Sequence, residues 1–176
     1  MWTFRPDYVV KRFIELEPAA LVAAGIRAVI VDLDNTLWAA DTVWLDPASE
    51  TALRGWLKTF PGKVAVVTNK LRRRDATKLW TLLEQLPLTG LVTGPLLKPL
   101  PFAFWRAARL LNVSPPEILV VGDFYLADIL GGKLAGMNTA LTSPLGRDEG
   151  VVATLARPID TWIAASYRHP RTGNPN

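Results

Sequence analysis

Two acidic residues follow an apolar run near the start of the chain. Residues 29–38 have the sequence VIVDLDNTLW, in which Asp32 and Asp34 come after three β-branched residues. Residues two apart on an extended strand point to the same side, so these carboxyl groups share one face. A cluster of buried carboxylates stays ionised when a cation shares the site. The segment therefore predicts a site in which carboxylates share a cation.

Further polar residues follow, or lie close to, other apolar runs of the chain. Ligands of open α/β sheets bind beyond the carboxyl ends of the strands, so residues at these ends are expected to meet. The residues at the predicted ends and in the adjoining loops are Thr68, Asn69, Lys98, Asp123 and Asp128.

This set of side chains suits phosphoryl transfer. Oxygen ligands without nearby His or Cys favour a hard ion, and Mg²⁺ fits because it keeps waters and binds phosphate substrates. One carboxylate can attack phosphorus, and a second can protonate the leaving oxygen and then activate water. A lysine and a hydroxyl can hold the phosphoryl oxygens while their charge changes.

Apolar runs alternate with helix-like segments along the chain. Strands are predicted at 27–33, 63–68, 88–93, 117–122 and 138–142. Helices are predicted near 48–59, 71–86, 101–112 and 126–135. This alternation predicts an α/β fold with a doubly wound, mainly parallel, Rossmann-like sheet. We expect one domain over 1–167 and a disordered tail over 168–176, which is polar and contains Pro and Gly.

Composition limits the possible classes of protein. The chain has 176 residues, a net charge of +4, a pI of about 9.6 and no cysteine, which excludes disulfides and thiolate metal sites. The N-terminal segment lacks the apolar region of a secretory signal, and no apolar run reaches the ~18 residues of a membrane span. We therefore expect a cytoplasmic protein without a transmembrane segment, and a peripheral contact with a membrane stays open.

Four segments together resemble the motifs of a known enzyme family. In chain order they are DLDNT, VVTNK, LLKP and GDFYLADILGG. They resemble the four motifs of the haloacid dehalogenase-like (HAD) phosphatases. Within these, the chain is similar to subfamily IIIA, the YqeG-type proteins related to mitochondrial phosphatidylglycerophosphatase. The resemblance extends over about residues 4–145 and includes the segment before the first motif.

The resemblance implies a role for each acidic residue of the first and last motifs. Asp32 would be the nucleophile and Asp34 the general acid and base. The side chains of Asp32 and Asp123, with the backbone carbonyl of Asp34, would hold Mg²⁺. Asp128 would orient the motif lysine or a metal-bound water.

The resemblance also implies a phosphate site. Thr68 and Asn69 would bind the phosphoryl group, and Lys98 would neutralise it. Three positions depart from the usual pattern of the family. Phe124 replaces a polar residue, Ala127 replaces Thr, and Lys70 stands where the YqeG-type proteins have Asn. None of these changes removes a proposed ligand, so we expect activity to be kept, with altered support for Asp128.

The intervals between the motifs bear on the size of the substrate. Each of the intervals 32–68 and 68–98 has room for about one helix and one strand, so neither can hold a cap domain. A capless, open site suits a bulky phosphomonoester, such as a phosphate on a lipid, a protein or a nucleic acid end.

Aromatic and basic residues surround the predicted site. They are Trp38, Trp44, Phe124, Tyr125 and the segment KLRRR at 70–74, which includes Arg72, Arg73 and Arg74. Such residues suit a membrane interface with anionic head groups, but they equally suit a core or a solvated helix face. The N-terminal segment with Val9, Phe13 and Leu16 is amphipathic and suits packing on the sheet or lying on a bilayer.

The sequence therefore predicts a Mg²⁺-dependent phosphatase that forms an aspartyl-phosphate. The resemblance implies phosphatidylglycerophosphate as the substrate, in phospholipid biosynthesis, with an anionic lipid head group as the partner and no nucleic acid partner. Two alternatives stay open. One is a phosphatase for another large or soluble phosphomonoester, such as a protein, nucleic acid end or nucleotide. The other is a non-catalytic module that keeps the fold.

Overall fold

Six parallel strands form one sheet in the computed structural model, which describes residues 4–40, 44–69, 86–93, 98–147 and 151–167. In spatial order the strands are β1 (Tyr8–Val9), β6 (Asn138–Leu141), β5 (Ile118–Gly122), β2 (Ala28–Val31), β3 (Val64–Thr68) and β4 (Gly90–Thr93). The chain moves from β2 to β3 on one side and returns to β5 on the other. The sheet therefore has a topological switch point between β2 and β5, where α/β folds bind their ligands.

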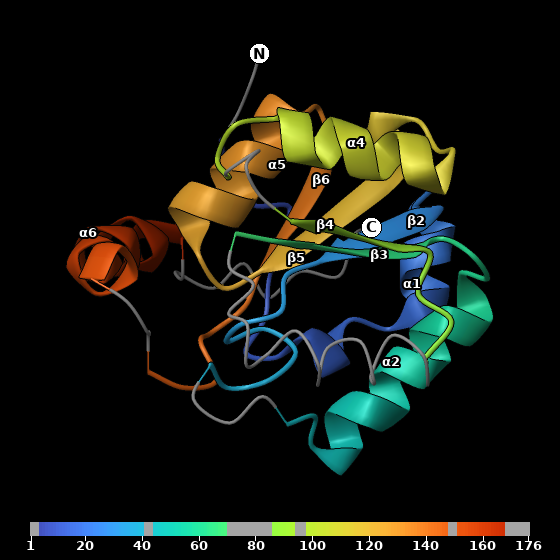
Figure 1. Ribbon diagram of the computed structural model, residues 1–176, viewed down its shortest axis with the longest axis horizontal. Helices are drawn as coiled ribbons and strands as arrows, with labels where there is room; N and C mark the ends of the chain where they lie inside the picture. Colours follow the sequence, from blue (N-terminus) through green and yellow to red (C-terminus); the bar gives the residue numbers. More distant parts are fainter. Residues whose placement is uncertain (1–3, 41–43, 70–85, 94–97, 148–150, 168–176) are drawn as a thin grey trace.

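Helices cover both faces of the sheet (Figure 1). The helices α1 (Pro18–Ala23) and α2 (Pro47–Thr59) lie on one face, and α4 (Phe102–Leu111) and α5 (Leu130–Leu134) lie on the other. A 3₁₀ turn, η1 (Phe13–Glu15), precedes α1, and a second, η2 (Pro115–Glu117), precedes β5. A π-helical segment, η3 (Tyr125–Ile129), leads directly into α5. The last helix, α6 (Val151–Tyr167), stands at the periphery and contacts η3.

Successive residues of the central strands face opposite layers. Val29 and Val31 of β2 pack in the apolar cluster with α2, whereas Ala28 and Ile30 pack in the cluster with α4. All four side chains are buried because helices cover both faces. This explains why the strand is uniformly apolar and does not alternate with polar residues.

The five strands predicted from the sequence are confirmed, each within two residues at either end. The helices predicted near 48–59 and 101–112 are α2 and α4, and the segment predicted near 126–135 is η3 together with α5. The helix predicted near 71–86 lies almost entirely outside the described residues. The prediction of a doubly wound parallel sheet is therefore confirmed.

The edge strand of the sheet and the last helix are among the elements that were not predicted. The two-residue strand β1 pairs with β6 at the edge of the sheet, and α6 follows the last strand. The amphipathic N-terminal segment packs against the protein, since Phe13 and Leu16 are buried in the core cluster with α2. The boundary between a domain at 1–167 and a tail stays a prediction, because residues 168–176 lie outside the described part. In the described part, no helix combines the length and the apolar character that crossing a membrane would require.

Candidate active site

Three buried carboxyl groups meet at the switch point of the sheet. Asp32 follows β2, and Asp123 follows the neighbouring strand β5. The hydrogen bonds between these two strands continue to Asp32, whose N–H donates to the carbonyl of Val121 at 2.9 Å. Asp128 lies on η3, which follows β5. Each of these three acids has a carboxylate oxygen within 4.8 Å of the others. The structure thus brings together the predicted metal ligands Asp32 and Asp123 and the predicted orienting residue Asp128.

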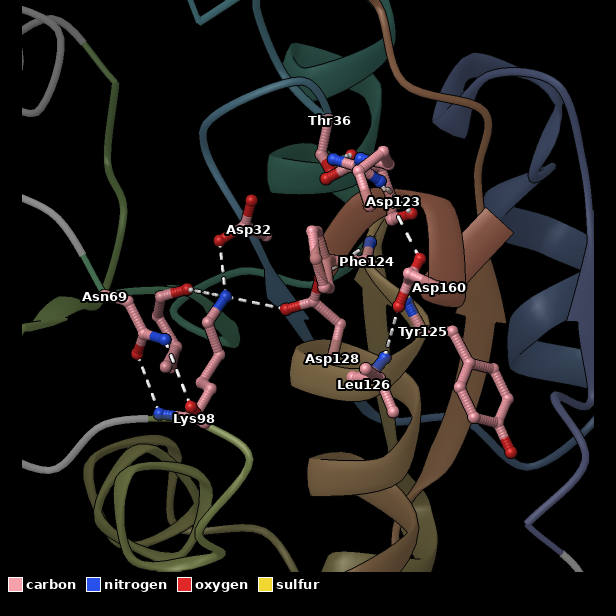
Figure 2. A network of polar contacts seen from close by, with 12 residues as sticks. Asp32, Thr36, Asn69, Lys98, Asp123, Phe124, Tyr125, Leu126, Asp128 and Asp160 are labelled. Atoms are coloured by element: carbon pink, nitrogen blue, oxygen red, sulfur yellow. Dashed lines mark hydrogen bonds and ion pairs between the residues drawn. The ribbon is translucent and has the colours of Figure 1, made fainter. Parts of the chain in front are cut away.

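Lys98 stands between two of these acids (Figure 2). Its Nζ donates to Oδ1 of Asp32 at 2.5 Å, to Oδ1 of Asp128 at 2.6 Å and to the carbonyl of Val67 at 3.1 Å. Burial alone would lower the pKa of Lys98, but the charges of Asp128 and Asp32 outweigh it and raise that pKa. The lysine therefore stays a cation beside the proposed nucleophile.

Asn69 fixes the backbone of Lys98. The Nδ2 of Asn69 donates to the Lys98 carbonyl at 3.2 Å, and the Lys98 N–H donates to Oδ1 of Asn69 at 2.7 Å. The sequence predicted that Asn69 contacts phosphate, and that role stays a prediction; the structure gives this side chain a positioning role as well. Thr68 is buried at the end of β3, next to Asn69.

Gly122 allows Asp128 to approach the strand. A Cβ on Gly122 would lie 2.2 Å from the Cγ of Asp128, a distance that no side chain tolerates. The second carboxylate oxygen of Asp128 accepts the N–H of Phe124 at 3.1 Å. The glycine of the GD pair in the last motif therefore has a steric role, because a side chain at Gly122 would occupy the space that Asp128 fills.

The loop after Asp32 turns sharply at Asn35, whose φ of 62° lies in the left-handed region that asparagine tolerates. Asp34 is half-buried, and its Oδ1 accepts the indole N–H of Trp38 at 3.2 Å. The predicted role of Asp34 as acid and base stays a prediction. The loop also brings Thr36 to Asp123, where its hydroxyl donates to Oδ1 at 3.4 Å.

The structure distinguishes between the two interpretations of the aromatic residues around the site. Trp38 is only 4% exposed and belongs to the core cluster with α2, and Tyr125 is buried against α6, so neither lies on an exposed rim. Trp44 is exposed, and Phe124 lies under a guanidinium group. Lys70 and Arg72 to Arg74 lie outside the described residues.

Arg157 of α6 was not predicted as a site residue. Its Nη2 donates to Oδ2 of Asp123 at 2.6 Å, and its Nη1 donates to the Asp123 carbonyl at 3.2 Å. The guanidinium lies 4.3 Å from the centre of the Phe124 ring. The departure at Phe124 therefore provides a stacking surface for the cation that holds Asp123.

Asp160, also on α6, holds the start of η3. Its Oδ2 accepts the N–H of Tyr125 at 3.1 Å and its Oδ1 accepts the N–H of Leu126 at 2.7 Å (Figure 2). The sequence contained a weak signal for this contact. Arg157 and Asp160 are three residues apart in a helix whose other residues carry no charge, and such an isolated pair suggests inward partners.

Burial sets the electrostatics of the carboxylate cluster. Burial raises the pKa of Asp32 well above its usual value, although Lys98 opposes this. Burial likewise raises the pKa of Asp123 to about 7 against the lowering effect of Arg157. The acids therefore hold protons more tightly than exposed carboxyl groups, which indicates that the two basic side chains do not fully compensate the cluster. A further cation would complete the compensation.

Comparisons with known proteins agree with this geometry. The family model described as "Mitochondrial PGP phosphatase" matches residues 2–146. The chain belongs to this family. It is a HAD-type phosphatase, as the four motifs predicted, and the alternative of a non-catalytic module is not retained.

Two curated relatives carry related names. "Probable phosphatase YqeG" of Bacillus subtilis is 30% identical over 168 residues, with 94% of this chain and 92% of the relative covered. "Phosphatidylglycerophosphate phosphatase 1, chloroplastic" of Chlamydomonas reinhardtii is 31% identical over 155 residues. That match covers 82% of this chain but 55% of the relative, so this chain spans about half the length of the algal protein.

A solved structure shares the fold. An uncharacterised protein from Listeria monocytogenes serotype 4b matches with a TM-score of 0.53 and 17% identity, over 80% of this chain and 99% of that one. This likeness supports the fold alone.

Proposed function

We propose that this phosphatase hydrolyses phosphatidylglycerophosphate with the help of Mg²⁺ and through an aspartyl-phosphate on Asp32. The observation that carries the chemistry is the position of Lys98, which bridges Asp32 and Asp128 in a buried cluster of carboxylates. The family match and the name of the algal relative support the substrate.

The donor set fits a hard divalent cation, because three buried carboxylates offer oxygen atoms within 4.8 Å of one another. Asp32 and Asp123, with the carbonyl of Asp34, would hold the ion, and the structure also brings Asp128 to the cluster. When bound, Mg²⁺ would supply positive charge to the phosphoryl oxygens.

The side chains divide the reaction into two steps. Asp32 attacks phosphorus and the bond from phosphorus to the leaving oxygen breaks, while Asp34 gives that oxygen a proton. Water then attacks the phosphoaspartate as Asp34 takes its proton, which releases phosphate and restores Asp32. Lys98 stabilises the phosphoryl charge in both steps, because Asn69 and the two acids fix its position.

A site without a cap domain would suit a large substrate. Between Asp32 and Thr68, the described residues form a loop, α2 and β3 and hold no inserted domain. Part of the interval from 69 to 98 lies outside the described residues, so the absence of a cap there stays a prediction.

The experiment that tests this function measures phosphate release from phosphatidylglycerophosphate, glycerol phosphate, a phosphopeptide, a nucleotide and a DNA 5′-phosphate. We expect the lipid to have the highest kcat/KM, with activity lost in chelator and restored by Mg²⁺. Asp32→Asn should abolish turnover, whereas Asp34→Asn should block hydrolysis yet still transfer labelled phosphate to the protein. Near-normal turnover by Asp32→Asn would exclude the covalent route, and a preference for a soluble ester would exclude the lipid.

A further inference from the structure

The outer side of α6 carries a stripe of exposed apolar residues. Leu155, Ile159 and Trp162 are 71%, 60% and 78% exposed, and their spacing of four and three residues places them on one face of the helix. Trp162 and Leu155 are the two most exposed of the large apolar side chains that the structure describes. These three residues are called the α6 stripe below.

The α6 stripe is free of charge, because the two charged residues of α6 face the other way. Arg157 binds Asp123, and Asp160 binds the backbone at Tyr125. The segment 151–167 contains no other charged residue. A face of this kind can enter an apolar phase without removing a charge from water, and a tryptophan suits the boundary between head groups and acyl chains.

A second copy of the chain does not suit the α6 stripe. A standard protein–protein interface buries about 800 Å² per partner from about 20–30 residues. Three side chains along one helix fall well short of that number. An interfacial helix, in contrast, needs only a narrow apolar face, since it binds through the burial of that face in the lipid.

The depth of the site also suits a bilayer. The inner side of α6 contacts Asp123, so the carboxylate cluster lies about one helix diameter, ~10–12 Å, from the α6 stripe. An interfacial helix buries its apolar face about 5–10 Å into the boundary between head groups and acyl chains. The cluster would then lie close to the level at which a phospholipid carries its phosphate.

We propose that the α6 stripe docks the protein on an anionic phospholipid bilayer and so holds the carboxylate site at head-group level. This inference rests on the proposed lipid substrate. The net charge of +4 adds a long-range attraction to anionic lipid.

The test measures sedimentation with vesicles of phosphatidylcholine and phosphatidylglycerol that contain no substrate. The triple variant Leu155→Gln, Ile159→Gln, Trp162→Gln keeps good helix formers while removing the apolar face. We expect its partition coefficient to fall at least about tenfold, since each large side chain loses burial in lipid. A matched control on α4, Phe102→Gln with Leu110→Gln, removes side chains that are 51% and 48% exposed, and it should bind as the wild type does.

Two activity measurements separate docking from the proposed function. Turnover of a small soluble phosphomonoester should be unchanged in both variants, which shows that the fold and the site are intact. Release of phosphate from phosphatidylglycerophosphate in vesicles should fall in the triple variant alone. If vesicle binding falls as expected but the wild type does not hydrolyse this lipid, docking stands and the proposed substrate is wrong.

Three results would overturn the docking proposal. One is normal vesicle binding by the triple variant, and another is an equal loss of binding in the α4 control. The third is a wild-type dimer in sedimentation velocity that the triple variant dissociates, because the α6 stripe would then bind a second copy.

Discussion

Asp160→Asn tests whether α6 positions the catalytic residues. The wild-type carboxylate uses one oxygen for the N–H of Tyr125 and the other for the N–H of Leu126, and the residue is 1% exposed. Asparagine keeps the shape but replaces one oxygen by an NH₂ group. One hydrogen bond is therefore lost, and two buried donors face each other.

The size of the effect follows from these contacts. Leaving a buried donor unsatisfied destabilises the folded state by about 1–3 kcal/mol. For a chain of this length, about 2 kcal/mol lowers Tm by about 4–8 °C. The start of η3 also positions Asp128, which binds Lys98. A small displacement there should lower kcat by roughly ten- to a hundredfold, because catalytic geometry tolerates little misplacement.

The assay combines thermal unfolding with kcat for a soluble phosphomonoester, so that no membrane contact enters the result. Asp46→Asn is the matched control, because Asp46 likewise uses both carboxylate oxygens at the start of a helix but lies outside the carboxylate cluster. Its Oδ1 accepts the N–H groups of Ala48 and Ser49, and its Oδ2 accepts Nη2 of Arg12 and the hydroxyl of Ser49. Asparagine keeps the Oδ1 cap but cannot accept Arg12 and Ser49 at the second position, so the control should lower Tm and yet keep its kcat. A fall in Tm without a change in kcat would show that Asp160 supports folding but does not position the site. If neither Tm nor kcat changes in Asp160→Asn, the two hydrogen bonds of Asp160 support neither the fold nor the site.

Three further predictions concern the cluster itself. Lys98→Met should lower kcat by about 10²–10³-fold, the effect of removing one donor to a developing oxyanion, in single-turnover kinetics. Gly122→Ala should destabilise the fold by about 1–3 kcal/mol in urea titrations and lower kcat, because the new methyl group meets Asp128. Since the pKa of Asp123 is raised from 3.8 to about 7, its proton stabilises the metal-free fold below pH 3.8, and this stabilisation is lost as the pH rises through about 7. Calorimetry should accordingly show Mg²⁺ affinity falling below pH 7, where the ion must displace this proton; pH-independent affinity would contradict the assignment.

The sequence predicted the strands and the residues that follow them because both depend on local patterns. Uniformly apolar, β-branched runs such as 28–31 occur where helices cover both faces of a sheet, and parallel strands bring their carboxyl ends to one edge. Asp32 and Asp123 could therefore be placed together from the sequence. The two residues of β1 are too few to form a pattern, and their pairing with β6 joins positions more than 130 residues apart.

Side-chain orientation was the part that the sequence did not provide. Trp38 follows the first motif, and an aromatic residue there suits either a rim or a core. The turn at Asn35 decides between them, since it directs the indole N–H to Asp34 and the ring into the core. The second role of Asn69 was hidden for a similar reason, because its partner Lys98 is 29 residues away and no local pattern joins them.

The two sides of α6 have different surroundings, and under the docking proposal this separates their roles. On the inward side, Arg157 binds Asp123, and Asp160 binds the backbone that leads to Asp128. Asp123 and Asp128 both belong to the carboxylate cluster. The family match ends at residue 146, before α6 begins, so these contacts come from a part of the chain that the family model does not match. The outward residues lie on the opposite side of the helix from these contacts. Changes to the α6 stripe should therefore alter where the enzyme acts, whereas changes to Arg157 or Asp160 should alter how well it acts.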